Sequence, residues 1–350
     1  MVSSSVWVTP GWGKFSVDNP AAVLYGAGDL RFEDRPEPAV GPGDVVVAVE
    51  AVGVCGSDVH YFEHGRIGQY VVQAPMIIGH EAAGTIVEVG DGVDRARIGQ
   101  LVALEPGVPD FSCEQCLAGR YNLCRNIRFF ATPPVDGAMV RRLTTVASFA
   151  HPAPVRLTAE QAAMAEPVSV GVWACRKAAV RLGDRVLVTG AGPIGLLAAQ
   201  VARAAGAREV TVTDTNAFRI AVARDLGFAA RHATDAASGE VDVLLECSGA
   251  AAALSSGLAQ LAPAGRAVLV GMGAETVSIE VPLIQNRELT LTGVFRYAQC
   301  YPTALDLIST GKVDVGPVIT HRFPLDEAEA AMTISRRDPR ALKAVVNPGG

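Results

Sequence analysis

The stretch Val186-Leu187-Val188-Thr189-Gly190-Ala191-Gly192-Pro193-Ile194-Gly195 decides the fold of the C-terminal half of this chain. Its apolar start predicts a buried strand, and the Ala-rich segment that follows, to about residue 205, predicts a helix. The first glycine allows a tight turn, the second lets the backbone approach a pyrophosphate, and the third permits close packing of the helix on the strand. The helix N-terminus presents amide donors to the anion. The stretch therefore predicts a dinucleotide site.

The residues around this stretch predict alternating strands and helices. Further apolar runs that predict strands lie at 210–213, 241–245, 267–270 and 289–291. This alternation is typical of the α/β class with a parallel, doubly wound (Rossmann) sheet covered by helices on both faces.

Asp214 and Arg219, which follow the second predicted strand, bear on the choice of cofactor. Asp214 follows Gly195 by nineteen residues, where an acid accepts hydrogen bonds from both ribose hydroxyls and repels a 2′-phosphate. We therefore predict NAD rather than NADP. For Arg219 the sequence leaves two alternatives open, a contact with the adenosine end of the cofactor or a solvated arginine on a helix face.

The chain before this alternation, from Ala21 to about Leu157, is predicted to be mostly β. Short β-branched runs such as 45–49 are separated by Gly, Pro and Asp turns. Thr158 then opens a helical segment with the spacing of a capping box, which we expect to be interrupted near Pro167 and to continue towards Val180. The chain closes with helical stretches and an apolar run, at 303–310, 325–334 and 342–346.

The composition predicts a folded, two-domain cytoplasmic protein that binds neither nucleic acid nor membrane. The 350 residues are 49% hydrophobic and 19% charged. A net charge of −6 gives no general attraction to phosphate backbones or anionic lipid. No apolar stretch approaches the roughly 18 residues of a membrane span, and residues 1–20 lack the features of a secretory signal. Three of the seven cysteines lie within twelve residues, which indicates metal binding more than disulfides.

Two motifs in the β-rich part carry residues suited to a metal. They are Gly53-Val-Cys55-Gly-Ser57-Asp58-Val-His60 and Gly79-His80-Glu81-Ala-Ala-Gly84. A catalytic zinc takes three such protein ligands and keeps one position open. A buried thiol and a hydrogen-bonded core histidine are the alternative. Because adjacent residues of a strand point to opposite faces, His80 and Glu81 reach one metal only if Gly79 permits an irregular backbone.

Longer motifs resemble the zinc-dependent medium-chain alcohol dehydrogenase superfamily. Gly79-His80-Glu81-x2-Gly84-x5-Gly90-x2-Val93 is similar to its zinc signature, and the run from Cys55 to Gly68 resembles the sorbitol/xylitol (polyol, L-iditol 2-) dehydrogenase branch. Further matches lie at 105–109, 130–134, 165–171 and 294–297, so the resemblance covers nearly the whole chain. It implies a mostly β GroES-like catalytic domain, split in sequence around a Rossmann domain. The expected boundaries are 1–168, 169–296 and 297–350, with a structural zinc lobe at about 105–125.

The resemblance implies that zinc polarises a secondary hydroxyl of a sugar alcohol, which is oxidised to the ketose with hydride transfer to NAD. Cys55, His80 and Glu81 would be direct ligands, and Glu166 a ligand or the holder of the zinc water. Asp58 is expected to hold the second ring nitrogen of His80. Ser57 and His60 lie where relatives relay the alcohol proton. A water fixed by Glu166 is the competing route, and a surface position is the competing interpretation of His60.

The resemblance also implies the residues that contact substrate and cofactor. A polyol exposes many hydroxyls, so Arg and Tyr donors beside aromatic walls suit it. The expected substrate residues are Tyr61, Phe129, Thr132, Glu166, Arg296 and Tyr297. The expected cofactor residues, besides the glycine turn, Asp214 and Arg219, are Val270, Gly271, Met272, Val294, Phe295 and Arg296.

A second cysteine cluster resembles the structural zinc lobe of the same family. Cys113-x2-Cys116-x7-Cys124 corresponds to three of its four ligands, and Asp110 stands at the first ligand position. Aspartate ligates zinc through oxygen, although four-cysteine closure is commoner in structural sites. Two alternatives stay open, a zinc held by one aspartate and three cysteines or a lobe without metal.

The leading hypothesis is an NAD-dependent polyol dehydrogenase for a sorbitol, xylitol or L-iditol type of substrate. A secondary-alcohol or threonine dehydrogenase is the alternative within the superfamily. A non-catalytic dinucleotide-binding protein is the alternative from another class, and it is disfavoured because every expected metal position is occupied by a ligating residue. The resemblance suggests a homotetramer.

Overall fold

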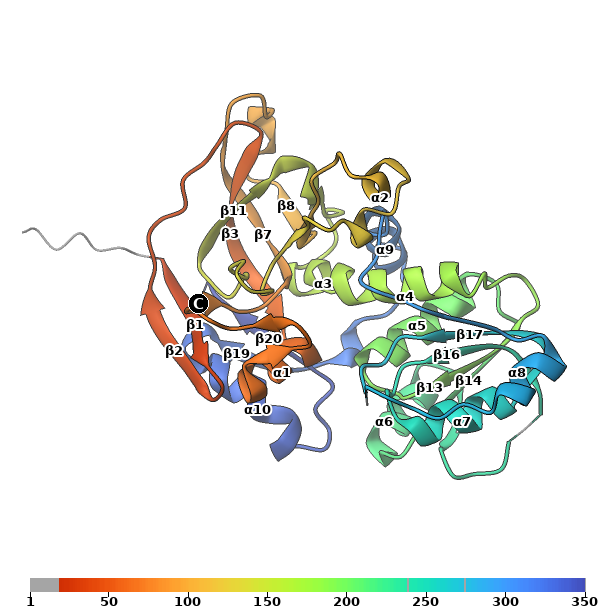
Figure 1. Cartoon of the computed structure of the whole chain (residues 1–350). Helices are drawn as coiled ribbons and strands as arrows, with labels where there is room; N and C mark the ends of the chain where they lie inside the picture. The colour runs from red at the N-terminus through yellow and green to blue at the C-terminus, as the bar shows by residue number, and fades with distance from the viewer. Residues whose placement is uncertain (1–18, 238, 274, 350) are drawn as a thin grey trace, which may run out of the picture.

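The computed structural model describes residues 19–237, 239–273 and 275–349 of the chain. Most of the N-terminal segment in which we looked for a secretory signal lies outside these residues. The described chain forms a β-rich part and a part of alternating strands and helices, which lie side by side (Figure 1). In these described ranges no helix is long and apolar enough to span a membrane.

The alternating part is built on a six-stranded sheet in which every neighbouring pair is parallel. The strand order is β15-β14-β13-β16-β17-β18, so the chain winds outward from β13 in both directions. This confirms the predicted doubly wound α/β sheet. The strands are β13 (Arg185–Thr189), β14 (Glu209–Asp214), β15 (Ala229–His232), β16 (Val241–Glu246), β17 (Leu261–Leu269) and β18 (Thr290–Gly293).

Helices cover both faces of this sheet because side chains alternate along its strands. Val186 and Val188 of β13 belong to the core beneath α4, α5 and α6, whereas Leu187 belongs to the core beneath α7 and α8. The α9 helix packs beside α4. The helices are α4 (Ala165–Lys177), α5 (Pro193–Ala204), α6 (Ala217–Asp225), α7 (Ala251–Ala259), α8 (Val281–Arg287) and α9 (Tyr301–Ser309).

The β-rich part contains a sheet in which strands from early and from late in the sequence pair with each other. Its strand order is β12-β8-β7-β3-β20-β19, and β11 also pairs with β3. Figure 1 shows the blue C-terminal strands among the red and orange N-terminal ones. The strands are β3 (Asp44–Gly53), β7 (Glu81–Val89), β8 (Leu101–Leu104), β11 (Arg142–Val146), β12 (Ala150–Pro152), β19 (Ile319–Pro324) and β20 (Lys343–Asn347).

Smaller elements complete the β-rich part. A three-stranded sheet has the order β2-β1-β6, and two further strand pairs are β4 with β5 and β9 with β10. The strands are β1 (Pro20–Gly26), β2 (Asp29–Asp34), β4 (Arg66–Ile67), β5 (Tyr70–Val71), β6 (Met76–Ile77), β9 (Gly107–Val108) and β10 (Arg128–Phe129). The helices are α1 (Gly56–His64), α2 (Glu114–Leu117), α3 (Ala159–Ala163) and α10 (Ala328–Arg337).

The predicted interruption of the helical segment near Pro167 is confirmed, three residues before the proline. The capping box at Thr158 is present and starts α3, but the break lies at Met164. Pro167 lies in the first turn of α4, where its missing N–H removes no intrahelical hydrogen bond. Proline here begins a helix instead of interrupting one, and Glu166 is thereby placed at the start of α4.

Candidate functional site

Asp58 joins the two predicted metal motifs. One carboxylate oxygen accepts the backbone N–H of Cys55 at 2.9 Å. The other accepts the N–H of Gly79 at 3.2 Å and lies 3.3 Å from Nδ1 of His80. The Asp58 side chain is buried at the start of α1. Because Nδ1 is held in this way, Nε2 is the His80 nitrogen left to bind a metal.

The backbone at Gly79 has the irregular geometry that a shared metal requires. Gly79 has φ +88°, and a Cβ there would lie 2.7 Å from Cγ of Met139 and 2.8 Å from Cγ1 of Val52. Only glycine fits this combination of backbone angle and space. It turns the chain so that His80 and Glu81, adjacent in sequence, face the same point.

Cys55, His80 and Glu81 offer ligand atoms that all lie within 4.8 Å of one another. His80 and Glu81 are buried, and Cys55 is half-buried at the N-terminus of α1. A thiolate, an imidazole nitrogen and a carboxylate oxygen form a donor set that zinc accepts in catalytic sites, with a fourth position left for water or substrate. The three residues therefore fit a catalytic zinc.

Lys343 of β20 is a buried partner of Glu81 that the sequence analysis missed. Its Nζ donates to the two carboxylate oxygens of Glu81 at 2.6 and 2.7 Å and to the carbonyl of Val54 at 2.9 Å. A carboxylate oxygen accepts more than one partner, so this ion pair is compatible with zinc ligation by Glu81. The only signal in the sequence is a single lysine inside the closing apolar run.

Glu166 is buried near this cluster, but it is not one of the three residues whose ligand atoms converge. Its Oε1 accepts a hydrogen bond of 2.8 Å from the hydroxyl of Tyr297. Burial raises the pKa of the Glu166 carboxyl to about 7, chiefly by desolvation. Its position suits a residue that holds a water or exchanges a proton better than a direct ligand.

Most of the residues predicted to contact substrate lie together beside His80. The Phe129 ring lies 5.7 Å from the imidazole, between ring centroids, and the Arg296 guanidinium carbon lies 3.8 Å from the Phe129 centroid. Nη2 of Arg296 donates to Oγ1 of Thr132 at 3.5 Å. Its Nη1 is buried and has no hydrogen-bond partner among the described residues, so it remains a donor for a ligand. Tyr61 is buried, which raises the pKa of its hydroxyl to about 12.

Ser57 and His60 lie one turn apart on α1, but no hydrogen bond joins them in the part of the chain that the structure describes. His60 is exposed, and its ring contacts that of His64 at 4.5 Å. The proton relay through these residues stays a prediction.

The glycine turn after β13 has the geometry of a pyrophosphate site. Gly190 has φ +90°, and a Cβ at Gly195 would lie 1.8 Å from the carbonyl oxygen of Gly190. Asp214 accepts the N–H of Ala191 at 2.6 Å, so this acid also holds the turn in place. Nη1 of Arg219 lies 3.9 Å from the position of a Cβ at Gly192, which places the arginine over the turn.

The remaining predicted cofactor residues lie where β17 and β18 end. The N–H groups of Val270 and Gly271 both donate to the carbonyl of Glu246, and the N–H of Val294 donates to Leu269. Met272 and Phe295 are exposed. In parallel sheets, ligands bind at these carboxyl ends of the strands.

A cavity of about 260 Å³ links the glycine turn to the metal cluster. It is lined on one side by Gly192, Pro193 and Ile194 and on the other by Cys55 and Lys343. Part of the predicted glycine turn and one predicted zinc ligand, Cys55, therefore face a single space between the two parts of the molecule.

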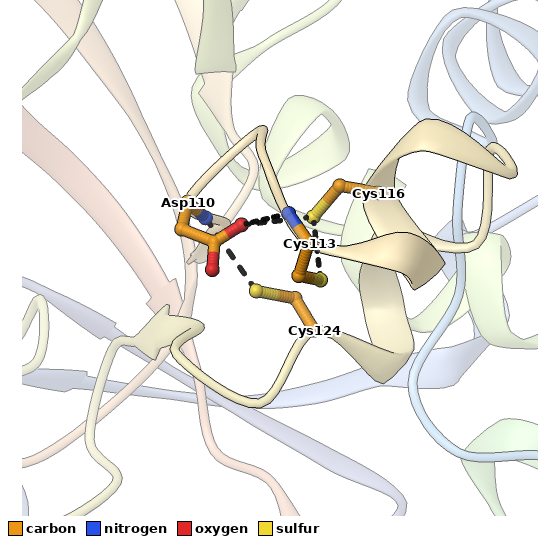
Figure 2. A group of neighbouring side chains, drawn as sticks. All are labelled: Asp110, Cys113, Cys116 and Cys124. Carbon is orange, nitrogen blue, oxygen red and sulfur yellow. Dashed lines mark hydrogen bonds between the residues drawn. The ribbon is translucent and has the colours of Figure 1, made fainter.

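The second cysteine cluster is also assembled (Figure 2). Asp110, Cys113, Cys116 and Cys124 offer ligand atoms within 4.8 Å of one another. Cys113 and Cys116 lie 3.4 Å apart between sulfurs, and Cys116 Sγ lies 3.4 Å from Oδ1 of Asp110. The backbone N–H groups of Cys113 and Ser112 keep the pKa of Asp110 well below its usual range. An ionised carboxylate beside three thiols fits a closed metal site.

Comparisons with known proteins agree with this geometry. The family model of the alcohol dehydrogenase GroES-like domain matches residues 41–155, and that of the zinc-binding dehydrogenases matches residues 193–310. Sorbitol dehydrogenase of Mus musculus is 42% identical over 333 residues, which cover 91% of this chain and 93% of the mouse protein.

Solved structures are similar over the same length. The 2R,3R-butanediol dehydrogenase of Bacillus subtilis has a TM-score of 0.87 at 28% identity and covers 95% of this chain and 100% of its own. Galactitol-1-phosphate dehydrogenase of Escherichia coli has a TM-score of 0.85 at 28% identity, with 94% and 100% covered.

Proposed function

The chain belongs to the zinc-dependent medium-chain alcohol dehydrogenases, in the branch of the sorbitol dehydrogenases, and from that premise we propose that it oxidises a secondary hydroxyl of a sugar alcohol to the ketose with NAD as hydride acceptor. The observation that carries the proposal is the convergence of Cys55, His80 and Glu81, of which Cys55 lines the same cavity as the glycine turn. A sorbitol, xylitol or L-iditol type of polyol is the proposed substrate.

Cys55, His80 and Glu81 would hold the zinc, and Asp58 and Lys343 would fix two of these ligands. Bound zinc supplies a Lewis acid that lowers the pKa of the substrate hydroxyl, and bound NAD accepts the hydride. Glu166, held by Tyr297, would fix a water and accept the alcohol proton. Ser57 and His60 remain the competing route for that proton.

The remaining roles follow from position. Arg296 would donate Nη1 to a distal hydroxyl of the polyol, beside the walls formed by Tyr61, Phe129 and Thr132. Asp214 would accept hydrogen bonds from the ribose hydroxyls of NAD and would repel the 2′-phosphate of NADP.

A panel of four- to six-carbon polyols, simple secondary alcohols and threonine, assayed with NAD and with NADP, tests this proposal. We expect turnover of polyols with NAD to exceed that of every other combination. Higher turnover of threonine or of a monohydroxy alcohol would favour the other dehydrogenases of the family. Stoichiometric NADH binding by a zinc-replete preparation that turns over no substrate would favour a non-catalytic dinucleotide-binding protein.

Glu166→Gln separates the proton role of Glu166 from zinc ligation. We expect turnover to fall by about 10²-fold, the usual contribution of a positioned acid or base, with zinc content unchanged. Glu160→Gln is the matched control, because Glu160 pairs with Arg322 on the surface of the preceding helix. A Glu166→Gln protein that has lost its zinc would identify Glu166 as a direct ligand.

We also propose a structural zinc at Asp110, Cys113, Cys116 and Cys124, which the compact donor set supports. Elemental analysis should give two zinc ions per chain. A single zinc, with Cys113 and Cys116 reactive towards thiol reagents, would show that the lobe lacks metal.

The assembly and location are proposed from the family resemblance as a cytoplasmic homotetramer. None of the seven cysteines, all of which the structure describes, forms a disulfide, as expected in a reducing compartment, and β18 lies at an edge of its sheet, where a second copy could pair. Light scattering coupled to size-exclusion chromatography would give the mass of the assembly, and a monomer would contradict the proposal.

A further inference from the structure

The loop of residues 295–299 carries Arg296 and Tyr297 of the proposed polyol pocket, and two of its residues have an unusual backbone conformation. Arg296 has φ +56° and Gln299 has φ +55°. This left-handed region is disfavoured for residues with a Cβ, and it persists where the surroundings hold the backbone in place. Contacts from outside the loop must therefore stabilise it.

Two hydrogen bonds hold the loop at both ends. Both come from the segment of about residues 105–125 that contains the second cysteine cluster, called here the cysteine lobe. The side-chain amide of Asn122 donates to the carbonyl of Phe295 at 2.9 Å. The backbone N–H of Gln299 donates to the hydroxyl of Tyr121 at 2.7 Å. Tyr121 and Asn122 are neighbours in the short η2 turn (Tyr121–Leu123), and they contact the residues on either side of the Arg296–Ala298 segment.

The buried carboxylate of Glu105 orients the Tyr121 hydroxyl so that it accepts the hydrogen bond from Gln299. The Tyr121 hydroxyl donates to Oε1 of Glu105 at 2.5 Å, so its lone pairs face Gln299. Oε2 of Glu105 lies 2.7 Å from Nε2 of His151, which holds the carboxylate at the end of β8. The η2 turn is thereby attached to the β-rich part, while the loop it holds follows β18 of the other part.

The loop in turn presents the pocket side chains. Arg296 stacks on Phe129 and leaves Nη1 without a partner among the residues that the structure describes, and Tyr297 donates to Glu166 at 2.8 Å. Releasing either end of the loop would let Arg296 leave its strained backbone conformation. The guanidinium would then lose its fixed direction towards the pocket.

We propose that Tyr121 and Asn122 are positioning residues for polyol recognition, which hold the loop of residues 295–299 so that Arg296 and Tyr297 face the substrate. This inference rests on the proposed polyol oxidation. It gives the cysteine lobe a part in selecting substrates with several hydroxyl groups, in addition to any metal that the lobe binds.

Steady-state kinetics of Tyr121→Phe and Asn122→Ala test the inference. We expect KM for sorbitol, or for the best polyol of the panel, to rise about tenfold in each variant with kcat within about threefold of wild type. The kcat/KM for 2-butanol, which has no distal hydroxyl for Arg296, should change much less. The zinc content should equal that of wild type.

Arg120→Ala is the matched control. Arg120 immediately precedes Tyr121, and its side chain bonds to Gln115 and not to the loop. We expect wild-type KM values in this variant. Equal losses for sorbitol and 2-butanol, or the same rise in KM in Arg120→Ala, would reduce the role of the pair to general stability and overturn the inference.

Hydrogen exchange of the loop gives a readout that needs no activity. The Gln299 amide should exchange faster in Tyr121→Phe than in wild type and in Arg120→Ala, because its acceptor has been removed. Unchanged exchange and unchanged KM in both variants would overturn the inference while the wild type still oxidised polyols. A wild type that turned over no polyol would instead contradict the proposed function, and the exchange rates would still decide whether the pair holds the loop.

Discussion

The two candidate zinc sites use similar ligands, but the residues of one come from distant segments of the chain and those of the other from a single short segment. Cys55, His80 and Glu81 come from two separate motifs and are fixed by Asp58 and Lys343, the latter 262 residues from Glu81 in sequence. The second cluster lies within the fifteen residues from Asp110 to Cys124 (Figure 2). The first is therefore a product of the whole sheet, whereas the second depends mainly on its own turns. This difference predicts that the two sites fail separately.

Replacing one cysteine at each site should have different effects on zinc content and turnover. We expect Cys55→Ser to lose one zinc and at least about 10³-fold of turnover, because the Lewis acid contributes several kcal/mol to the reaction. Cys124→Ser should lose the other zinc and keep turnover within about tenfold of wild type. Zinc analysis and kcat measurements check both. A folded Cys124→Ser protein as inactive as Cys55→Ser would refute the independence of the sites.

Lys343→Met should destabilise the catalytic cluster through the distant strand. The substitution leaves the buried Glu81 carboxylate without its cation, which costs about 3–5 kcal/mol in the free energy of unfolding of chelator-treated protein. Urea denaturation measures this change. Lys312→Met, at an exposed position, should change the free energy by less than about 0.5 kcal/mol. Equal stability of the two variants would mean that Lys343 does not hold Glu81.

Asp110→Cys should produce the smallest effect, because it alters one ligand of a local site. A fourth thiolate completes the commoner structural donor set, and we expect zinc retention by the lobe against a chelator to improve about tenfold, the scale of typical changes around metal ligands. Turnover should stay at the wild-type value. A loss of zinc from the variant would show that the amides around Asp110, which suit a carboxylate, select oxygen at this position.

The sequence predicted those features whose evidence lies in neighbouring residues. The parallel sheet, the glycine turn and the capping box at Thr158 are confirmed, because each is encoded within a few residues. The need for an irregular Gly79 was predicted from the two adjacent ligand candidates, and its φ of +88° agrees. The interruption predicted near Pro167 lies three residues earlier, at Met164, because a proline near a helix start and one that interrupts a helix look alike in sequence.

The features that were missed depend on partners distant in sequence. Nothing near Lys343 indicates Glu81, and nothing near Asn122 indicates the carbonyl of Phe295. Periodicity and motif spacing report on local structure, so an ion pair or a hydrogen bond between distant segments becomes visible only in the folded chain.

The pairing of β20 with β3 has a consequence for the order in which the protein matures during synthesis. The strands of the nucleotide sheet lie in one continuous stretch, so that sheet can close while the ribosome is still translating. The sheet that holds Glu81 needs residues 343–347, which follow all strands of the nucleotide sheet in the sequence and are therefore translated later. We therefore expect the reactive centre to be completed after the nucleotide sheet, and a chain that lacks β20 to be a dinucleotide-binding protein without a finished catalytic metal site.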